Sequence, residues 1–308
     1  MSTEIMSDKI VKVRKSQFSV ARLPLHLVLG GFCLLCLVPL LLVIAISFTP
    51  ETLLKSGGYT LFPKAYSVQA YEYIFRNSMQ IARSYGITSL VTLIGTIMGL
   101  WCTTAIAYVI TRPDFRYRRF LMFFIFFTML FSGGLTPSYL LVTKTLHLKD
   151  SLLALILPAV MQGWYVILMK GFLQSLPNSI VESAKIDGVG EFGIFTRIII
   201  PISTPGMATV GLFLMLQYWN DWYSSLLYID NQNLVSLQFL LYKLMASIEF
   251  FKVMAAMAPG SIKIDPLSIP TLSARMAMCV IAAGPMVVIF LFLQKYFIRG
   301  IVVGSIKG

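Results

Sequence analysis

Residues 177–201 carry a compact group of polar side chains between two long apolar stretches of the chain. The group includes Glu182, Lys185, Asp187 and Glu191, and a glycine directly follows the aspartate. Carboxylates and a lysine could take part in acid–base chemistry, but the segment holds no nucleophile–base pair, no cluster of metal ligands and no phosphate-binding loop. Its composition therefore predicts a mechanical or docking role rather than catalysis.

The remaining chemistry-bearing residues do not form a recognisable site. Cys33 and Cys36 have the CxxC spacing, but they lie inside an apolar run, where we interpret them as packing residues. His26 and His147 have no ligand cluster beside them. No G-x-x-x-x-G-K-[ST] pattern occurs, so the chain cannot bind ATP through a P-loop. We expect a non-enzymatic protein that binds no metal and no cofactor of its own.

The composition indicates the class of protein that must position these residues. Of the 308 residues, 57% are hydrophobic and 12% are charged, and the mean hydropathy is +0.80. A water-soluble domain carries about 25% charged residues. A membrane-spanning helix needs about 20 apolar residues, and only helices or closed barrels satisfy their backbone in lipid. The long apolar runs predict an all-α integral membrane protein with six spans, at 27–48, 85–110, 120–142, 152–171, 199–220 and 276–297.

The charged residues predict the orientation of these spans. The net charge is +12, and 15 of the 25 Lys and Arg residues fall in segments that would share one side with the N-terminus. The densest cluster is the short loop RPDFRYRR at 112–119. Because short cytoplasmic loops are rich in Lys and Arg, we expect both termini and residues 177–201 in the cytoplasm. We divide the chain into a cytoplasmic segment at 1–26, with a retained first span, and a six-helix domain at 27–308.

The polar segment itself should form a helical elbow. Pro177 can open a first helix, and Gly188 can end it in a left-handed conformation. A second short helix should begin at Gly190 and Glu191, and Pro201 should mark the start of the fifth span. The two predicted apolar faces consist of Ile180, Val181 and Ala184 in the first helix, and Phe192, Phe195 and Ile198 in the second.

Glycines and prolines inside four of the spans predict close helix contacts or bends. They are Gly133, Gly134 and Pro137 in the third span, Gly163 in the fourth, Pro205 and Gly206 in the fifth, and Gly284 and Pro285 in the sixth. The two long outer segments, 49–84 and 221–275, are not expected to span the membrane.

Three motifs, in order along the chain, resemble those of ABC-importer permeases for carbohydrates, the maltose-permease-like family. Glu182-Ser183-Ala184, Asp187-Gly188 and Ile198 to Pro201 resemble the "EAA" loop, with Ser183 and Ile200 as small departures. Trp219-Asn220 resembles the W-N motif after the fifth span. Gln294 to Gly300 and Gly304 to Gly308 resemble the closing Q-x-Y-F-x-x-G and G-x-x-K-G patterns.

This resemblance implies a type I ABC-importer permease fold in which the elbow is the coupling helix. It implies that Glu182, Ser183, Ala184, Asp187 and Gly188 contact a cytoplasmic ATPase, which would bind and use ATP and Mg²⁺. The implied partners are two ATPase copies, a second six-helix permease chain in a heterodimer, an extracytoplasmic solute-binding protein and membrane lipid. Nucleic acid is not among them. The implied location is the bacterial cytoplasmic (inner) membrane.

The cargo implied by the resemblance is an oligosaccharide, received from the binding protein. The stretches 131–151 and 61–75 look most like the oligosaccharide and polyuronate subgroup, which includes aldouronate and alginate importers. Tyr218, Trp219, Asn220 and Asp221 are the candidate pathway residues. Trp222 and Tyr223 fit a sugar pathway and an aromatic interface belt equally well. An acidic sugar would suit the outward lysines Lys55, Lys64, Lys144 and Lys149.

Three other functions remain open from the sequence. An ion-coupled secondary transporter would need ionisable residues at the midplane of its spans, and none is evident there. A scaffold subunit would have no use for the elbow. An ABC permease for another solute would share the elbow but not typically the W-N and closing motifs.

Overall fold

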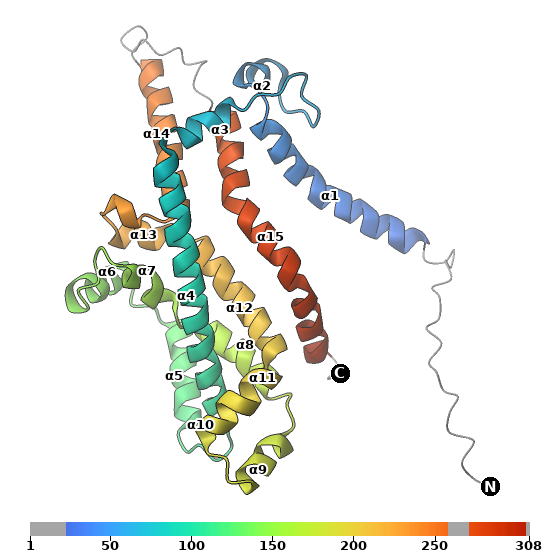
Figure 1. Ribbon diagram of the computed structural model, residues 1–308, viewed down its shortest axis with the longest axis vertical. Coiled ribbons are helices and arrows are strands. Elements are labelled where there is room, and N and C mark those ends of the chain that lie inside the picture. The colour runs from blue at the N-terminus through green and yellow to red at the C-terminus, as the bar shows by residue number, and fades with distance from the viewer. Residues whose placement is uncertain (1–22, 258–270, 306–308) are drawn as a thin grey trace.

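The computed structural model describes residues 23–257 and 271–305, which form helices joined by loops, with no β-strand among them. Most of the segment expected at 1–26, the Pro- and Gly-rich stretch at 258–270 and the last residues of the closing motif lie outside this described part. Figure 1 shows an elongated molecule in which α4 runs along most of the length, with the elbow at the lower end.

Three helices are long and apolar enough to cross a membrane without interruption. They are α1 (Leu23–Ser47), α4 (Ser78–Thr111) and the Leu272–Phe292 part of α15 (Leu272–Ser305). These helices confirm the first, second and sixth predicted spans. Pro39 and Pro285 lie inside α1 and α15 without ending them. The break expected at Gly284 and Pro285 is therefore absent from α15.

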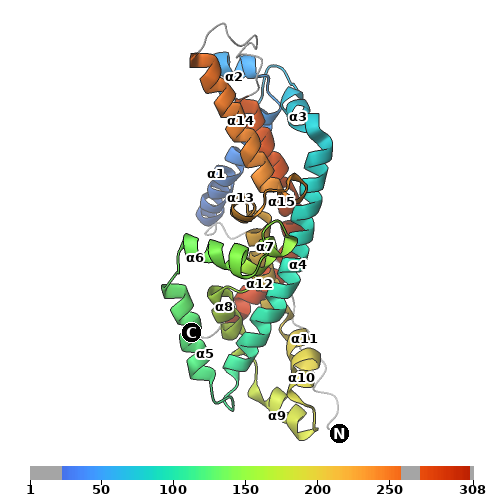
Figure 2. The ribbon, with the colours of Figure 1, turned by 90° about the vertical axis from the view of Figure 1, so that its left-hand side faces the viewer.

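The third predicted span is not one continuous helix. Helix α5 (Arg118–Leu130) stops, and α6 (Leu135–Leu140) with η3 (Leu141–Thr145) continues at 113° to it. The bend expected from Gly133, Gly134 and Pro137 is confirmed, because Gly134 adopts a φ of +86° that a helix cannot contain. In Figure 2, α6 lies across the molecule instead of continuing the direction of α5.

The fourth and fifth spans are also bent pairs. Helix α7 (Leu152–Ile156) with η4 (Leu157–Ala159) meets α8 (Gly163–Leu173) at 53°. The helical run Glu191–Ile202 meets α12 (Thr204–Trp219) at 81°, beside Pro205 at the start of α12. Proline cannot donate a helical hydrogen bond, so a break here is expected. The six predicted spans are thus three continuous helices and three bent pairs.

The outer segments contain short helices and one long one. They are α2 (Glu51–Gly57), α3 (Gln69–Ile74), η2 (Phe75–Asn77), α13 (Tyr223–Tyr228), η6 (Gln232–Leu234) and α14 (Leu237–Met257). Helix α14 is 21 residues long, yet it does not qualify as a membrane span. Within the described residues of the segment 221–275, only the first turn of α15, from Leu272, belongs to a candidate span.

Helix α4 is the centre of the core, where it packs against α8 and α12. Its buried residues recur every three or four positions and include many threonines and glycines. The small residues are required by close neighbours. A Cβ atom at Gly95 would lie 2.4 Å from the ring of Tyr218, and one at Gly99 would lie 3.0 Å from the side chain of Leu214. These contacts join α4 tightly to α12.

A buried carboxylate fastens α2 to the start of α15. Glu51 is only 4% exposed, and it accepts hydrogen bonds from the Thr271 hydroxyl (2.7 Å) and the backbone N–H groups of Leu272 and Ser273 (3.1 and 3.2 Å). These N–H groups have no partner within a helix, so Glu51 caps α15 from a distant element. The cap sets the N-terminal end of the sixth span.

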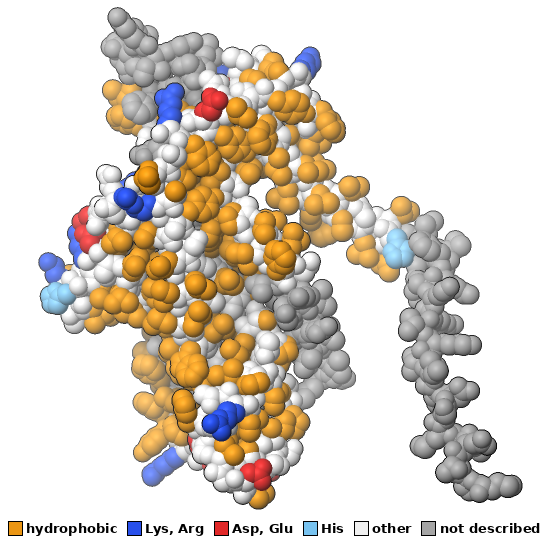
Figure 3. Space-filling view, viewed as in Figure 1, with side chains coloured by type: hydrophobic (Ala, Val, Ile, Leu, Met, Phe, Trp, Pro, Cys, Tyr) orange, Lys and Arg blue, Asp and Glu red, His pale blue; other side chains and the backbone are white. Residues whose placement is uncertain are grey.

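The apolar surface indicates how much of the molecule faces lipid or another chain. The apolar window of α1 is 0% buried, against 44% for that of α4. Figure 3 shows apolar side chains over much of the visible face, with charged side chains towards the ends and the left-hand edge. The described residues alone therefore cover little of α1, whose exposed side chains require lipid or a further subunit.

Candidate functional site

The elbow has the geometry that its glycine and proline pattern predicts. Helix α9 (Asn178–Ile186) begins directly after Pro177, and Gly188 ends it with a φ of +76°. The N–H of Val189 donates to the Ala184 carbonyl (3.0 Å), and the N–H of Gly188 donates to that of Lys185 (3.1 Å). These two bonds define a Schellman motif, which confirms the left-handed helix end.

The second arm of the elbow differs in detail from the prediction. It consists of α10 (Glu191–Ile194), the π-helical turn η5 (Phe195–Ile199) and α11 (Ile200–Ile202). Phe195 is buried as expected, with its ring centroid 5.6 Å from that of Tyr108 in α4. Phe192 was placed on the same face, but it is 72% exposed. Ile194 is the buried residue of α10, and Ile199 is buried with Phe195 in the π-helical turn.

The predicted coupling residues lie together at the tip of the elbow. Glu182, Ser183, Asp187 and Gly188 are exposed, whereas Ala184 is buried and supports α9 from beneath. The backbone N–H of Asp187 donates to the Ser183 carbonyl (3.0 Å), and the Asp187 side chain is exposed. A docking surface made of these four residues is therefore accessible.

Two large apolar residues at the same tip are exposed, although the sequence placed Phe192 on an apolar face and gave Ile186 no role. Ile186 is 87% exposed and Phe192 is 72% exposed, on opposite sides of the Asp187-Gly188 turn. Large apolar side chains this exposed commonly mark contact surfaces. A signal was present in the sequence, since both residues sit beside the turn within an otherwise polar stretch.

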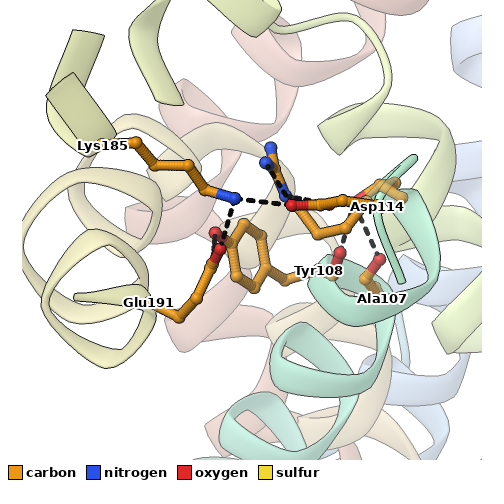
Figure 4. A network of polar contacts seen from close by, with 7 residues as sticks. Ala107, Tyr108, Asp114, Lys185 and Glu191 are labelled. Atoms are coloured by element: carbon orange, nitrogen blue, oxygen red, sulfur yellow. Dashed lines mark hydrogen bonds and ion pairs between the residues drawn. The ribbon is translucent and has the colours of Figure 1, made fainter. Parts of the chain in front are cut away.

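A network of charged residues ties the elbow to the C-terminal end of α4 (Figure 4). The Lys185 ammonium lies 2.5 Å from Oδ2 of Asp114 and 2.7 Å from Oε1 of Glu191. The Tyr108 hydroxyl donates to Oε2 of Glu191 (2.8 Å). Arg112 Nε lies 3.4 Å from Oδ1 of Asp114. The network thus joins α9, α10, α4 and the loop between α4 and α5.

The members of this network favour one another's charged forms. The hydrogen bond with Asp114 raises the pKa of Lys185, and the reciprocal bond with Lys185 lowers the pKa of Asp114. The pKa of Glu191 is lowered chiefly by its hydrogen bond with Lys185. All three groups are therefore charged at neutral pH, as ion pairing requires.

The structure places the four candidate pathway residues in two different environments. Tyr218 is 2% exposed and its hydroxyl donates to the Ile156 carbonyl (2.8 Å). Trp219 is 3% exposed and its Nε1 donates to the Ala282 carbonyl (2.8 Å). Both side chains brace α12 against neighbouring helices. Asn220 is exposed, and Asp221 is half-buried with Oδ1 accepting from the Ser224 N–H (3.0 Å).

An aromatic cluster that the sequence analysis recognised only in part lies beside these residues. The ring of Trp222 stacks on that of Tyr242 in α14, with centroids 4.7 Å apart, and it contacts Tyr223 edge-on. All three rings are at least 38% exposed. Lys243 is also exposed, and its amine lies 4.5 Å from the ring centroid of Phe239. Tyr242 and Lys243 were missed because only the folded chain places α14 beside Trp222.

Two of the lysines that were expected to face outwards form ion pairs within the chain. Lys149 pairs with Asp230 at 2.6 Å, and Asp150 accepts the backbone N–H groups of Asp230 (2.6 Å) and Asn231 (2.8 Å). Lys55 lies 3.7 Å from Glu51. The contacts of Lys149 and Asp150 join the segment before α7 to the segment after α13. Lys149 and Lys55 are thus already engaged within the chain.

Residues with metal-binding side chains are scattered. Within residues 23–257 and 271–305, no group of three or more His, Cys, Asp or Glu is placed to hold a metal ion. Cys33 and Cys36 are free thiols on the exposed surface of α1.

Comparison with known proteins gives consistent matches. Residues 93–303 match the family model described as "Binding-protein-dependent transport system inner membrane component". The polygalacturonan/rhamnogalacturonan transport system permease protein YtcP of Bacillus subtilis is 38% identical over 278 residues, covering 90% of this chain and 94% of YtcP. The arabinooligosaccharides transport system permease protein AraQ of the same organism is 30% identical, covering 95% of this chain and 98% of AraQ.

A solved structure shows the same fold. It is a chain from the crystal structure of a bacterial ABC transporter involved in the import of the acidic polysaccharide alginate, with a TM-score of 0.74 and 24% identity. The match covers 91% of this chain and 99% of the other. The fold is therefore that of a type I ABC permease, as the motifs predict.

Proposed function

The chain belongs to the family of inner membrane components of binding-protein-dependent transport systems, and on that basis we propose that it is the transmembrane permease subunit of an ATP-driven oligosaccharide importer. It is an integral protein of the cytoplasmic (inner) membrane, as its family and apolar helices indicate. The observation that carries the proposal is the exposed, Schellman-capped elbow between α8 and α12 in a chain of this family. Family membership argues against an ion-coupled secondary transporter.

We further propose that this elbow docks on a separate cytoplasmic ATPase through Glu182, Ser183, Asp187 and Gly188, with Ala184 supporting them from beneath. The absence of a P-loop pattern from the sequence supports a chain that hydrolyses no ATP itself. ATP and Mg²⁺ would be used by two ATPase copies. The exposed apolar surface of α1 supports a second permease chain, which would complete the assembly with an extracytoplasmic binding protein. Both termini would then be cytoplasmic.

The cargo that we propose is an acidic oligosaccharide, such as a galacturonide or an alginate fragment. YtcP is named for polygalacturonan and rhamnogalacturonan transport, and the structural relative for alginate import. Exposed aromatic rings can stack on sugar faces, as Trp222 and Tyr242 could, and Asn220 could read hydroxyl groups. The Lys243 ammonium would favour a carboxylate beside these rings.

Uptake by the reconstituted complex tests this function. Proteoliposomes would contain the permease pair and the ATPase, with binding protein and either an oligogalacturonide or a neutral oligosaccharide of matched length. We expect ATP-dependent uptake of the acidic oligosaccharide. The neutral one should be taken up more slowly or not at all. A preference for the neutral sugar would contradict the acidic cargo, and a neutral-only importer would be the second candidate function. ATP-independent uptake driven by an ion gradient would contradict the importer itself.

A further inference from the structure

We propose that Lys185 is a positioning residue that locks the elbow to the inner end of α4, so that a push on the elbow moves α4 together with α8 and α12. The inference rests on the proposed function, because it concerns how displacement by an ATPase enters the membrane helices. Lys185 lies outside the exposed set Glu182, Ser183, Asp187 and Gly188 assigned to docking, and its side chain is turned towards α4 rather than towards a partner (Figure 4).

The position of Lys185 within the elbow makes it a junction of three segments. It is in the last turn of α9, and its ammonium binds Asp114 in the α4–α5 loop and Glu191 at the start of α10. The pair with Glu191 spans the Gly188 turn and therefore fixes the angle between the two arms. The pair with Asp114 fixes both arms to the end of α4.

On the α9 side, the elbow is held by the buried side chains of Val181 and Ala184 in the core and by the Lys185 ion pairs. A cavity of about 220 Å³ lies between α4, the end of α8, α9 and η5, and it is lined by Arg112, Asn178 and Val181 among others. A second cavity of about 260 Å³ is lined by Tyr108, Arg112, Asp114 and Glu191. Both cavities are lined by residues of the elbow and of the region around the C-terminal end of α4, so the Lys185 ion pairs connect two parts that close packing does not join completely.

Helix α4 is suited to carry a displacement across the membrane. Its 34 residues form one helix, about 51 Å long at 1.5 Å per residue. At the outer end, Gln80 donates to the Gln232 carbonyl (2.7 Å), Arg83 donates to Asn233, and the Leu237 N–H donates to the Thr88 hydroxyl (2.8 Å). Helix α4 is thus attached to the elbow at one end and to the loop that precedes α14 at the other.

The ion pairs of Lys185 with Asp114 and Glu191, here called the clamp, are accessible to water. The side chains of Lys185, Asp114 and Glu191 are 37%, 53% and 54% exposed. Ion pairs in contact with water add little to stability, so breaking them should not unfold the elbow. Their effect is to specify geometry, and removal should therefore impair coupling more than folding.

The test compares Lys185→Met, which keeps the length of the side chain without its charge, with Arg197→Met as the matched control. Arg197 is an exposed cation on the same elbow and no part of the clamp. In the reconstituted complex, Lys185→Met should lower ATP hydrolysis stimulated by loaded binding protein about fivefold, within the usual range of coupling between sites. ATPase assembly and unstimulated hydrolysis should be unchanged, Lys185→Arg should restore stimulation, and Arg197→Met should behave as wild type.

A double-mutant cycle shows whether the clamp acts as one unit. Asp114→Asn with Lys185→Met should lower stimulation no further than Lys185→Met alone, because both remove the same contact. Additive losses, or wild-type stimulation in Lys185→Met, would overturn the inference while leaving the importer intact. Loss of assembly in Lys185→Met would assign the residue to docking and equally overturn it. A wild-type complex without any stimulation would instead refute the proposed function.

Discussion

At the scale of single residues, the most consequential buried charge is that of Glu51. Burial alone would raise the pKa of this carboxyl, but hydrogen bonds from Thr271, Ser273 and Leu272 outweigh that effect and lower the pKa. The ionised form is thus the one that caps α15. Sequence analysis gave no reason to single out Glu51, because its partners are about 220 positions away.

Replacement of Glu51 should therefore destabilise the N-terminal end of the sixth span. Glu51→Gln removes the charge and leaves buried donors with poorer partners, so we expect the free energy of unfolding to fall by about 1–3 kcal/mol. Thermal unfolding of the purified protein in detergent measures this loss. Glu72→Gln, at an exposed position in α3, is the control and should unfold like the wild type.

The same carboxylate predicts a dependence of stability on acid. Because the pKa of Glu51 is lower in the folded protein than its ordinary value of 4.5, its contribution is fully present above that value. The contribution disappears as the pH falls through the lowered pKa. The stability difference between wild type and Glu51→Gln should thus be constant from neutral to mildly acidic pH and shrink below about pH 4. An unchanged difference in strong acid would exclude an ionised cap.

At the scale of elements, the elbow depends on one left-handed residue. Gly188 and Gly190 both have open space where a Cβ atom would be, but only Gly188 has a positive φ, of 76°. Gly190 has a φ of −66° and a ψ of 157°, which any residue adopts. Because neither site is crowded, comparing the same substitution at the two glycines isolates the effect of the backbone conformation.

Alanine should impair the protein at Gly188 but not at Gly190. Gly188→Ala should strain the Schellman turn by about 1–2 kcal/mol and weaken ATPase docking, because a left-handed conformation is unfavourable for L-residues. Gly190→Ala should assemble like the wild type. Co-purification of the ATPase with each variant provides the measurement. Equal assembly of the two variants would show that the turn does not position the docking residues.

The contact between α4 and α12 offers a second test at this scale. Gly95→Ala would place a methyl group 2.4 Å from the buried ring of Tyr218, whose hydroxyl is held by the Ile156 carbonyl. Overpacking of this kind costs about 1–3 kcal/mol, so the melting temperature should fall. Gly171→Ala in α8 meets nothing within 4 Å and should match the wild type. A stable Gly95→Ala protein would mean that α12 shifts away without cost.

At the scale of the whole molecule, the fold separates two polar ends. The elbow and the α4–α5 loop lie at one end, and α2, α3 and the outer part of α14 lie at the other (Figures 1 and 2). Only α4 runs past both groups of elements in the part of the chain that the structure describes. This arrangement makes the orientation in the membrane a decisive property of the proposed importer.

Labelling of single cysteines tests the orientation in cells. With the four native cysteines replaced, a cysteine at the exposed Ser179 of the elbow should react with an impermeant reagent only after the membrane is permeabilised. A cysteine at the exposed Ser56 of α2 should react in intact spheroplasts. The reverse pattern would place the elbow outside the cell, where an ATPase could not reach it.

The sequence by itself determined the class of protein, the number of spans and the elbow. An apolar run of about 20 residues can satisfy its own backbone hydrogen bonds in lipid by forming a helix. The Asp187-Gly188 turn is likewise a local property of the backbone. Local chemistry also marked the three bent spans, at Gly134, Gly163 and Pro205, but not the angle of each bend.

Only the tertiary structure decided which residues act together. The Lys185 contacts with Asp114, the Glu51 cap on α15 and the stacking of Trp222 on Tyr242 each join segments whose separation in sequence carries no signal. The burial of Tyr218 and Trp219 likewise follows from glycines and carbonyls on other helices. Periodicity and turn residues specify individual elements, whereas side-chain partners depend on how close packing arranges those elements.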